Sequence, residues 1–184
     1  MGILGIYASS VLKVTSSYES IATVNLSSNQ STVDFSSIAG TYKHLELRFI
    51  TRNNRGSLLD GLYVRFNSDS GTNYSDHNLQ GDGASASAAA STSTSYIIAA
   101  LVNGTTANTN VFSAGVMSIL DYSNTSKNKT TRTLGGFDNN GNGYIRLSSG
   151  LWRNTAAITS ITIGSTDGSG ILANSSFALY GIKG

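Results

Sequence analysis

Short runs in which apolar and polar residues alternate are the feature that most constrains how this chain can fold. Residues 41–49 read TYKHLELRF and residues 61–66 read GLYVRF, so that every second side chain is apolar over most of each run. Successive side chains of a β-strand point to opposite faces, and this period of two therefore predicts strands with one buried face. Segments rich in Ser, Thr, Asn and Gly separate the runs, as is typical of turns. The pattern predicts an all-β protein.

The same signals recur along the whole chain, whose 184 residues suit one well-buried domain. They predict about ten short antiparallel strands in a single jelly-roll-like β-sandwich. Residues 83–95 have low complexity and are predicted to be a mobile or partner-ordered loop, whereas residues 138–143 are predicted to be a hairpin loop. The expected strands are residues 19–26, 31–35, 43–51, 61–67, 76–81, 95–102, 111–121, 129–137, 143–152, 158–164 and 175–182.

The composition offers little to an enzyme. The chain has no Cys, which excludes disulfides, thiolate metal sites and thiol catalysis. His44 and His77 are its only imidazoles, and no nucleophile-elbow motif is present. Asp69, Asp76 and Asp82 lie near His77 in the sequence and could in principle join it around a metal ion, but such residues are equally typical of ordinary turns. We therefore expect no catalytic residue, no cofactor and no metal.

Charge and hydropathy make nucleic acid and membranes poor candidates as partners. The net charge is +2, from 12 basic and 10 acidic residues, and the densest basic segment, residues 127–132, is interpreted as a solvated loop. No stretch approaches the roughly 20 apolar residues of a membrane span. The apolar N-terminus lacks the charged region of a signal peptide. We expect binding to neither a membrane nor nucleic acid.

The chain is predicted to divide into an N-terminal arm, residues 1–17, and a β-sandwich domain, residues 18–184. The arm is apolar, but its Gly residues and Ser pairs argue against a free helix. An exposed apolar arm would promote aggregation, so we expect it to be buried, and we favour burial against a neighbouring subunit. Its candidate partner-binding residues are Ile3, Leu4, Ile6, Tyr7, Val11 and Leu12.

A small set of residues could instead serve surface recognition. Trp152 is the only Trp, and Arg153 follows it. We favour Trp152 as an anchor at the edge of the core or at an interface, with a carbohydrate platform as the alternative. Tyr74 and His77 are the other candidates for a recognition surface.

Several segments together resemble a group of small virion proteins of tailed bacteriophages, of the kind common in aquatic phages. The resemblance covers about residues 20–183, and the ending SSFALYGIK is its most specific piece. The matching segments are residues 36–48, 60–74, 81–83, 149–152, 157–162 and 176–183.

The resemblance implies a structural component of a phage particle with a jelly-roll-like fold, located in the virion, and it carries over no catalytic residue. We expect a capsid decoration, or cement, protein that clamps neighbouring capsid subunits and forms a homotrimer, with the arm packed into a seam of the capsid. The alternative is a tail, neck or fibre-tip module that binds a host glycan or another tail protein. A polysaccharide-cleaving enzyme is a third, least favoured interpretation.

Overall fold

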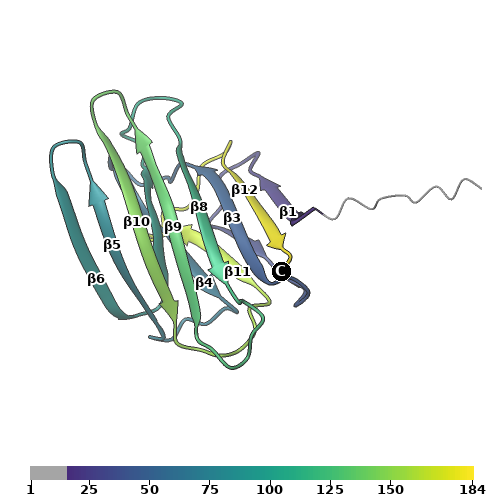
Figure 1. The fold of residues 1–184 in the computed structure, drawn as a ribbon. Helices are drawn as coiled ribbons and strands as arrows, with labels where there is room; N and C mark the ends of the chain where they lie inside the picture. The colour runs from purple at the N-terminus through teal and green to yellow at the C-terminus, as the bar shows by residue number, and fades with distance from the viewer. Residues whose placement is uncertain (1–15) are drawn as a thin grey trace, which may run out of the picture.

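The computed structural model describes residues 16–184 and shows an all-β chain, in which the described residues contain no helix. Accordingly, no helix in that range is long and apolar enough to cross a membrane. All strand pairs are antiparallel (Figure 1). The strands are β1 (Tyr18–Asn25), β2 (Thr32–Phe35), β3 (His44–Thr51), β4 (Leu59–Phe66), β5 (Tyr74–Gly81), β6 (Ala86–Thr94), β7 (Ile97–Asn103), β8 (Ser113–Leu120), β9 (Lys129–Asp138), β10 (Gly143–Trp152), β11 (Ile161–Ser165) and β12 (Ser176–Ile182).

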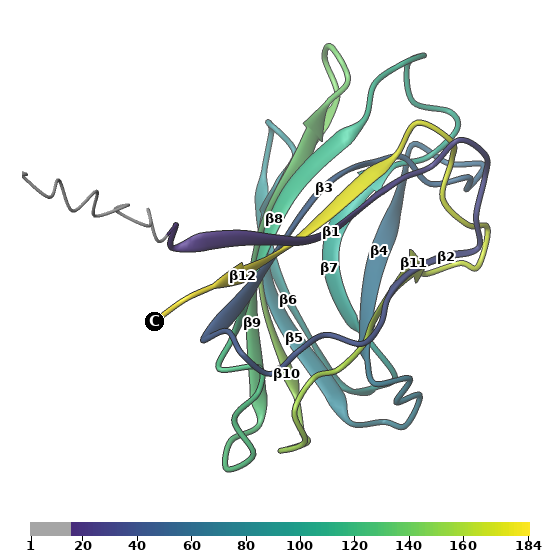
Figure 2. The same cartoon turned by 90° about the vertical axis from the view of Figure 1, so that its right-hand side faces the viewer.

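Two sheets of unequal width form a sandwich. The wide sheet has eight strands in the order β1-β12-β3-β8-β9-β10-β5-β6, and the narrow sheet has four in the order β2-β11-β4-β7. Figure 2 shows the sheets face to face, with the narrow sheet covering one side of the wide sheet. The other side of the wide sheet, its outer face, is therefore left without a covering layer in the described part of the chain.

Alternating side chains of both sheets fill the space between them. Leu45, Leu47 and Phe49 of β3 are buried, as their spacing predicts. On the narrow sheet, every second residue of β4 is buried in the same way, and Tyr63 and Arg65 point outward. Burial of a large apolar side chain contributes about 1.5–3 kcal/mol. The core of the sandwich includes Leu62, Val64, Phe66, Ile97, Met117, Ile119, Ile161, Ile163, Phe177 and Leu179.

The structure confirms the all-β sandwich and corrects the interpretation of residues 83–95. Each expected strand overlaps an observed one, and the first observed strand begins at Tyr18, the first residue of the expected domain. Residues 83–95, expected to be a loop, contain β6 instead. This strand consists of Ala, Ser and Thr and is almost entirely exposed, so no apolar pattern marks it. It forms because β5 offers it a hydrogen-bonding edge.

The loop between β9 and β10 is a hairpin loop, as predicted. Asn140 and Gly141 adopt positive φ angles of 56° and 114°, the backbone region that Asn and Gly tolerate best. Asp138 accepts a hydrogen bond from the backbone N–H of Asn140 at 2.8 Å, which closes the turn. The resulting register pairs Leu134 of β9 with Leu147 of β10.

The two sheets approach closely at Gly150, and this gives a first prediction. A Cβ atom at Gly150 would lie 2.6 Å from the Ile97 side chain and 2.6 Å from the Thr131 hydroxyl. We expect Gly150→Ala to lower the free energy of unfolding by about 1–3 kcal/mol because the packed interior must move apart. Urea unfolding measures the change. Gly56→Ala is the matched control, since nothing lies within 4 Å of its Cβ position; an equal loss in both variants would contradict the packing argument.

Candidate interaction face

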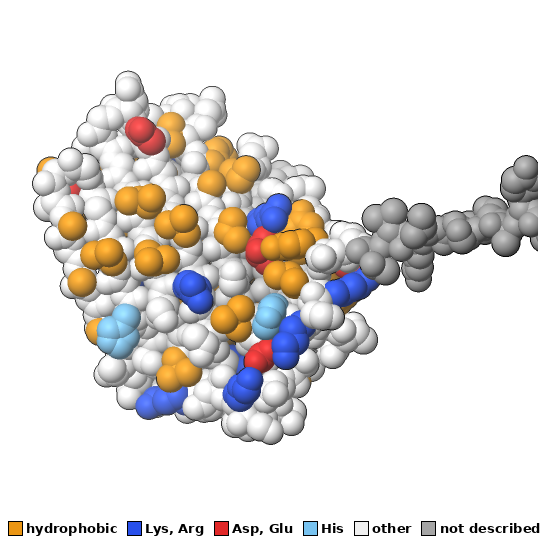
Figure 3. All heavy atoms as spheres, in the orientation of Figure 1, with side chains coloured by type: hydrophobic (Ala, Val, Ile, Leu, Met, Phe, Trp, Pro, Cys, Tyr) orange, Lys and Arg blue, Asp and Glu red, His pale blue; other side chains and the backbone are white. Residues whose placement is uncertain are grey.

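Six large apolar side chains stand on the outer face of the wide sheet, between 41% and 61% exposed. They come from five adjacent strands, β3, β8, β9, β10 and β5. Figure 3 shows apolar side chains gathered over these strands, while most charged groups in that view lie toward one side. We call this surface the apolar face; it consists of Ile50, Val116, Leu134, Ile145, Leu147 and Leu79.

Strand register aligns these side chains in rows that run across the sheet. Val116 pairs with Leu134, Leu134 with Leu147, and Leu147 with Leu79. Cross-strand neighbours on one face have Cβ atoms about 4.5–5.5 Å apart, so the row is a continuous apolar strip. The row next to it begins at Ile50 and continues through Ala114, Gly136 and Ile145 in the same way.

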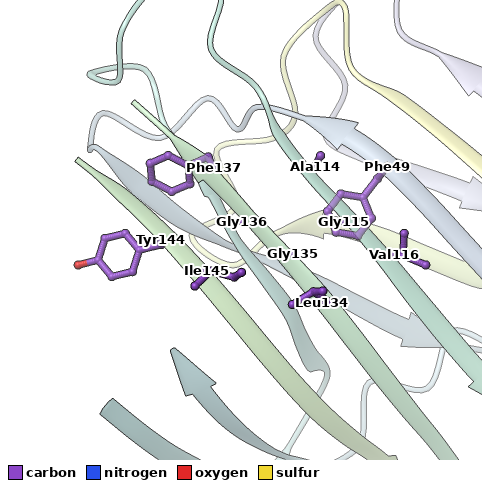
Figure 4. Close-up of a pocket in the computed structure, with 10 residues that line it drawn as sticks. All are labelled: Phe49, Ala114, Gly115, Val116, Leu134, Gly135, Gly136, Phe137, Tyr144 and Ile145. Carbon is purple, nitrogen blue, oxygen red and sulfur yellow. The ribbon is translucent and has the colours of Figure 1, made fainter. Parts of the chain in front are cut away.

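Small residues in the second row leave a hollow in the apolar face. Ala114 and Gly136 stand between larger neighbours, and the hollow has a volume of about 500 Å³. Its lining is almost wholly apolar, and Figure 4 shows that it comes from β3, β8, β9 and β10. The hollow has room for more than one large apolar side chain. It is lined by Phe49, Ala114, Gly115, Val116, Leu134, Gly135, Gly136, Phe137, Tyr144 and Ile145.

The strands beneath this surface reverse the usual orientation of polar and apolar residues. In β10, Ile145 and Leu147 point to solvent, whereas Arg146 and Ser148 are buried. β5 likewise buries Asp76 and exposes Leu79. Charged residues are rarely buried and exposed apolar clusters are rarely large in monomeric proteins. The reversal leaves an unusually apolar surface exposed on the outer face of these strands and makes that surface a candidate for a contact.

A polar and aromatic cluster borders the apolar face where β3 and β12 meet β1. The Arg48 guanidinium lies 5.0 Å from the ring centre of Tyr180 and 5.7 Å from that of Tyr18. It also donates to Glu46 Oε1 at 2.8 Å. Glu46 is the first reason that the pKa of Arg48 is raised, since the carboxylate favours the charged guanidinium. The cluster gives the face a defined polar border on the side where the chain enters β1.

Two of the residues predicted for surface recognition are buried. Trp152 is 1% exposed, and its indole N–H donates to Asp69 Oδ2 at 2.7 Å. This hydrogen bond is the main reason that the pKa of Asp69 is lowered. Tyr74 is fully buried and stacks on Trp152 with ring centres 6.2 Å apart. Burial raises the pKa of Tyr74 to about 12. The prediction of a recognition surface at Trp152 and Tyr74 was wrong, because both point inward from their strands; the interpretation of Trp152 as a packing anchor fits the structure.

The other two candidates are exposed but do not gather into a site. Arg153 extends along the surface and donates to the backbone carbonyl of Thr72. His77 lies on the outer side of β5, so it points away from Asp76 and borders the apolar face beside Leu79. Asp69 is engaged by Trp152 instead. Among residues 16–184, no group of three or more acidic or imidazole side chains could hold a metal ion.

The arm residues lie outside the described part of the chain. Ile3, Leu4, Ile6, Tyr7, Val11 and Leu12 all precede residue 16, where the description begins. Their role stays a prediction.

Comparisons with protein-family models, curated proteins and solved structures gave no match for this chain. The resemblance to phage virion proteins therefore also stays a prediction. What the structure adds is the apolar face, which sequence reasoning missed. A signal was present in β10, where residues 145–148, IRLS, place Arg146 and Ser148 on one side of the strand and Ile145 and Leu147 on the other. The period of two marks a strand in both orientations, but it does not say which side is buried.

Proposed function

We propose that this protein is a non-enzymatic structural component of a tailed-phage particle, and in particular a capsid decoration protein. The observation that carries the proposal is the apolar face. An isolated chain would leave it in water, whereas a decoration protein would bury it against neighbouring subunits and so link them. The resemblance of residues 20–183 to phage virion proteins, most specific at the C-terminal strand, supplies the biological setting.

The apolar face offers enough surface for a stable contact. Each Leu or Ile that becomes fully buried contributes about 1.5–3 kcal/mol, and the face carries six large apolar side chains. Association costs about 4–15 kcal/mol in lost freedom of motion. Because these side chains are already about half-buried in the free protein, binding adds only part of that stabilisation. A contact over the whole face would still offset most or all of that cost.

We also propose that the strand path is a jelly roll with two added hairpins. The strand orders support this. Without the hairpins β5–β6 and β9–β10, the sheets read β1-β12-β3-β8 and β2-β11-β4-β7, so that the eight remaining strands divide equally between two four-stranded sheets. Jelly rolls occur in viral capsid domains and in lectins. The two added hairpins widen one sheet and carry most of the apolar face, which lies on β9, β10 and β5 as well as on β3 and β8.

The copy number of the protein in purified particles tests the proposal. A decoration protein is expected in many copies, in proportion to the capsid subunits, whereas a tail, neck or fibre-tip module would be present in a few. A low copy number would favour that alternative. Trp152 and Tyr74, the aromatic candidates for a glycan platform, are buried and so do not support that alternative.

A variant of the apolar face gives the second prediction. Ile145, at 61%, is the most exposed of its large apolar residues. We expect Ile145→Ser to reduce the occupancy of particles several-fold while the stability of the free protein changes by less than about 0.5 kcal/mol. Quantitative gel analysis of particles measures occupancy. Ile98→Ser is the matched control, because Ile98 is half-buried on the outside of the narrow sheet. Equal occupancy in the two variants would contradict a role of the face in attachment.

A further inference from the structure

We propose that the N-terminal segment of one copy, residues 1–15, binds the apolar face of a second copy, and that such contacts close a ring of subunits. The inference rests on the proposed function as an assembly protein. It deepens that function by naming the two surfaces that join the copies.

The segment and the apolar face match in chemistry. Residues 1–12 carry no charged side chain, and Lys13 is the only one within the first 15 residues. The face is likewise free of charge along its two rows, except at the Arg48 end. Apolar surfaces associate because contact removes both from water. Besides Met1, seven large apolar residues of the segment are available for this contact: Ile3, Leu4, Ile6, Tyr7, Val11, Leu12 and Val14.

The segment is long enough to cover the face. Four strand spacings separate β3 from β5, the two outermost strands of the face, which corresponds to about 19 Å across the sheet. Fifteen residues in extended conformation span at most about 50 Å. A segment that enters from a neighbouring copy could therefore cross both apolar rows and place side chains in the hollow beside Leu134.

The direction of β1 favours binding of the segment to the apolar face of a second copy over binding to the face of its own chain. β1 begins at Tyr18, opposite Ile182, and ends at Asn25, opposite Ser176. Ser176 is in register with Ile50, so β1 runs toward the level of the apolar rows as it proceeds. Ser17 still accepts a hydrogen bond from the backbone N–H of Lys183 at 3.0 Å. Ser16 and Ser17 therefore lie at the end of β1 that is farther from the rows, which favours a neighbouring copy as the binding partner of residues 1–15.

A contact between a segment and a face is made by two different surfaces. Each copy therefore offers one free segment and one free face until the assembly closes, and closure produces a ring. A ring of three agrees with the homotrimer expected from the sequence. Such a ring would cover part of each apolar face and leave the remainder for contact with the particle, without requiring the two wide sheets to pack on each other.

Complementation between two defective variants tests the inference. Leu134→Glu places a charge in the centre of the face, and Ile6→Glu combined with Leu12→Glu places charges in the segment. The full chain is expected to be oligomeric by light scattering after gel filtration, and each variant to be monomeric, with the dissociation constant raised at least about 10-fold. The equimolar mixture should form a dimer, because one intact segment then meets one intact face. Leu134→Thr with Leu147→Thr replaces the face variant if the charged side chain prevents folding.

Three results would overturn the inference. A monomeric full chain would show that copies do not join. A segment variant that stays oligomeric would show that the faces pack on each other or that another surface is used. A mixture that stays monomeric would show that the segment and the face do not meet between copies.

Disulfide trapping provides an independent readout, since the natural chain has no Cys. A chain carrying Leu12→Cys, mixed with one carrying Leu134→Cys, is expected to form a disulfide-linked heterodimer. Asp34→Cys is the control partner, because Asp34 is exposed on β2 of the narrow sheet. A chain with both Leu12→Cys and Leu134→Cys that links only internally would place the segment on its own face and overturn the inference.

These measurements use the purified protein alone, so their failure differs from failure of the proposed function. A monomer that decorates particles in many copies would reject the ring and leave the decoration role intact. A ring that is absent from particles would reject the decoration role and leave the contact between segment and face intact.

Discussion

Trp152→Ala is expected to lower the free energy of unfolding by about 3–5 kcal/mol, which is the range for a fully buried aromatic residue. The Trp152 ring packs against Phe66, with ring centres 5.7 Å apart, and stacks on Tyr74 at 6.2 Å. Removal of the side chain leaves a cavity between the two sheets and deprives Asp69 Oδ2 of the indole N–H at 2.7 Å. Guanidinium unfolding measures the loss, and the melting temperature should fall by about 10 °C or more.

Trp152→Phe separates packing from hydrogen bonding. Phe fills most of the space but cannot donate to Asp69, so we expect a loss of about 1–2 kcal/mol. An alanine variant that loses less than about 1 kcal/mol would contradict the buried position of Trp152. Any glycan binding should therefore be tested at exposed Arg153, because an effect of Trp152→Ala would report unfolding instead.

The period of two in the sequence was sufficient to predict the strands whose buried residues are large and apolar. β3 and β4 show why: the large residues on their buried faces are mainly Leu, Val and Phe, and this arrangement removes them from water. The same signal fails for β6, where Ala, Ser and Thr on both sides give no contrast. A strand of that kind depends on pairing with β5, which is a tertiary interaction that the local sequence does not contain.

Lys129 illustrates a second limit of the sequence. The basic segment 127–132 was expected to be a solvated loop, yet Lys129 begins β9 and is fully buried. Its Nζ donates to the backbone carbonyls of Asn124, Lys127 and Thr155 at 2.7, 2.8 and 2.9 Å. Three carbonyl acceptors replace the water that the ammonium group loses on burial. Carbonyl positions follow from the folded backbone, so composition alone could not reveal this site.

The candidate interaction face was missed for a related reason. Strand periodicity fixes which residues share a side, but the choice of the inner side depends on where the second sheet lies. In β10 the inner side carries Arg146 and Ser148. These two side chains can be buried because Arg146 finds hydrogen-bond acceptors in Ser148 of the same strand and Gln80 of β5. The Arg146 Nε atom donates to Ser148 Oγ at 2.9 Å and Nη1 donates to Gln80 Oε1 at 3.3 Å. Ile145 and Leu147, which alternate with these polar residues along the strand, therefore point outward.

This polar layer leads to the last prediction. Arg146 Nη2 lies 3.5 Å from Asp76 Oδ1, and the two side chains are 7% and 1% exposed. Loss of one partner of a buried ion pair typically costs about 3–5 kcal/mol, because the remaining charge stays out of water. We expect Arg146→Met to lose that amount at neutral pH. We expect the double variant Arg146→Met with Asp76→Leu to recover most of it, since an apolar pair leaves no buried charge.

The penalty should depend on pH with a definite sign. Burial raises the pKa of Asp76 above its ordinary value, while Arg146 acts in the opposite direction. Without Arg146, the pKa of Asp76 in the folded state rises further. A carboxyl group with a raised pKa in the folded state contributes stability that is fully present below its unfolded pKa of about 3.9 and is lost as the pH rises through the folded value.

Urea unfolding of Arg146→Met should therefore show a large deficit in the free energy of unfolding relative to the natural chain at about pH 7 and a small one at about pH 4. Asp76→Asn in the Arg146→Met background should abolish this dependence, because no ionisable group then remains at position 76. A deficit of equal size at both pH values would mean that the cost comes from lost packing of the Arg146 side chain and that the Asp76 charge has no part in it.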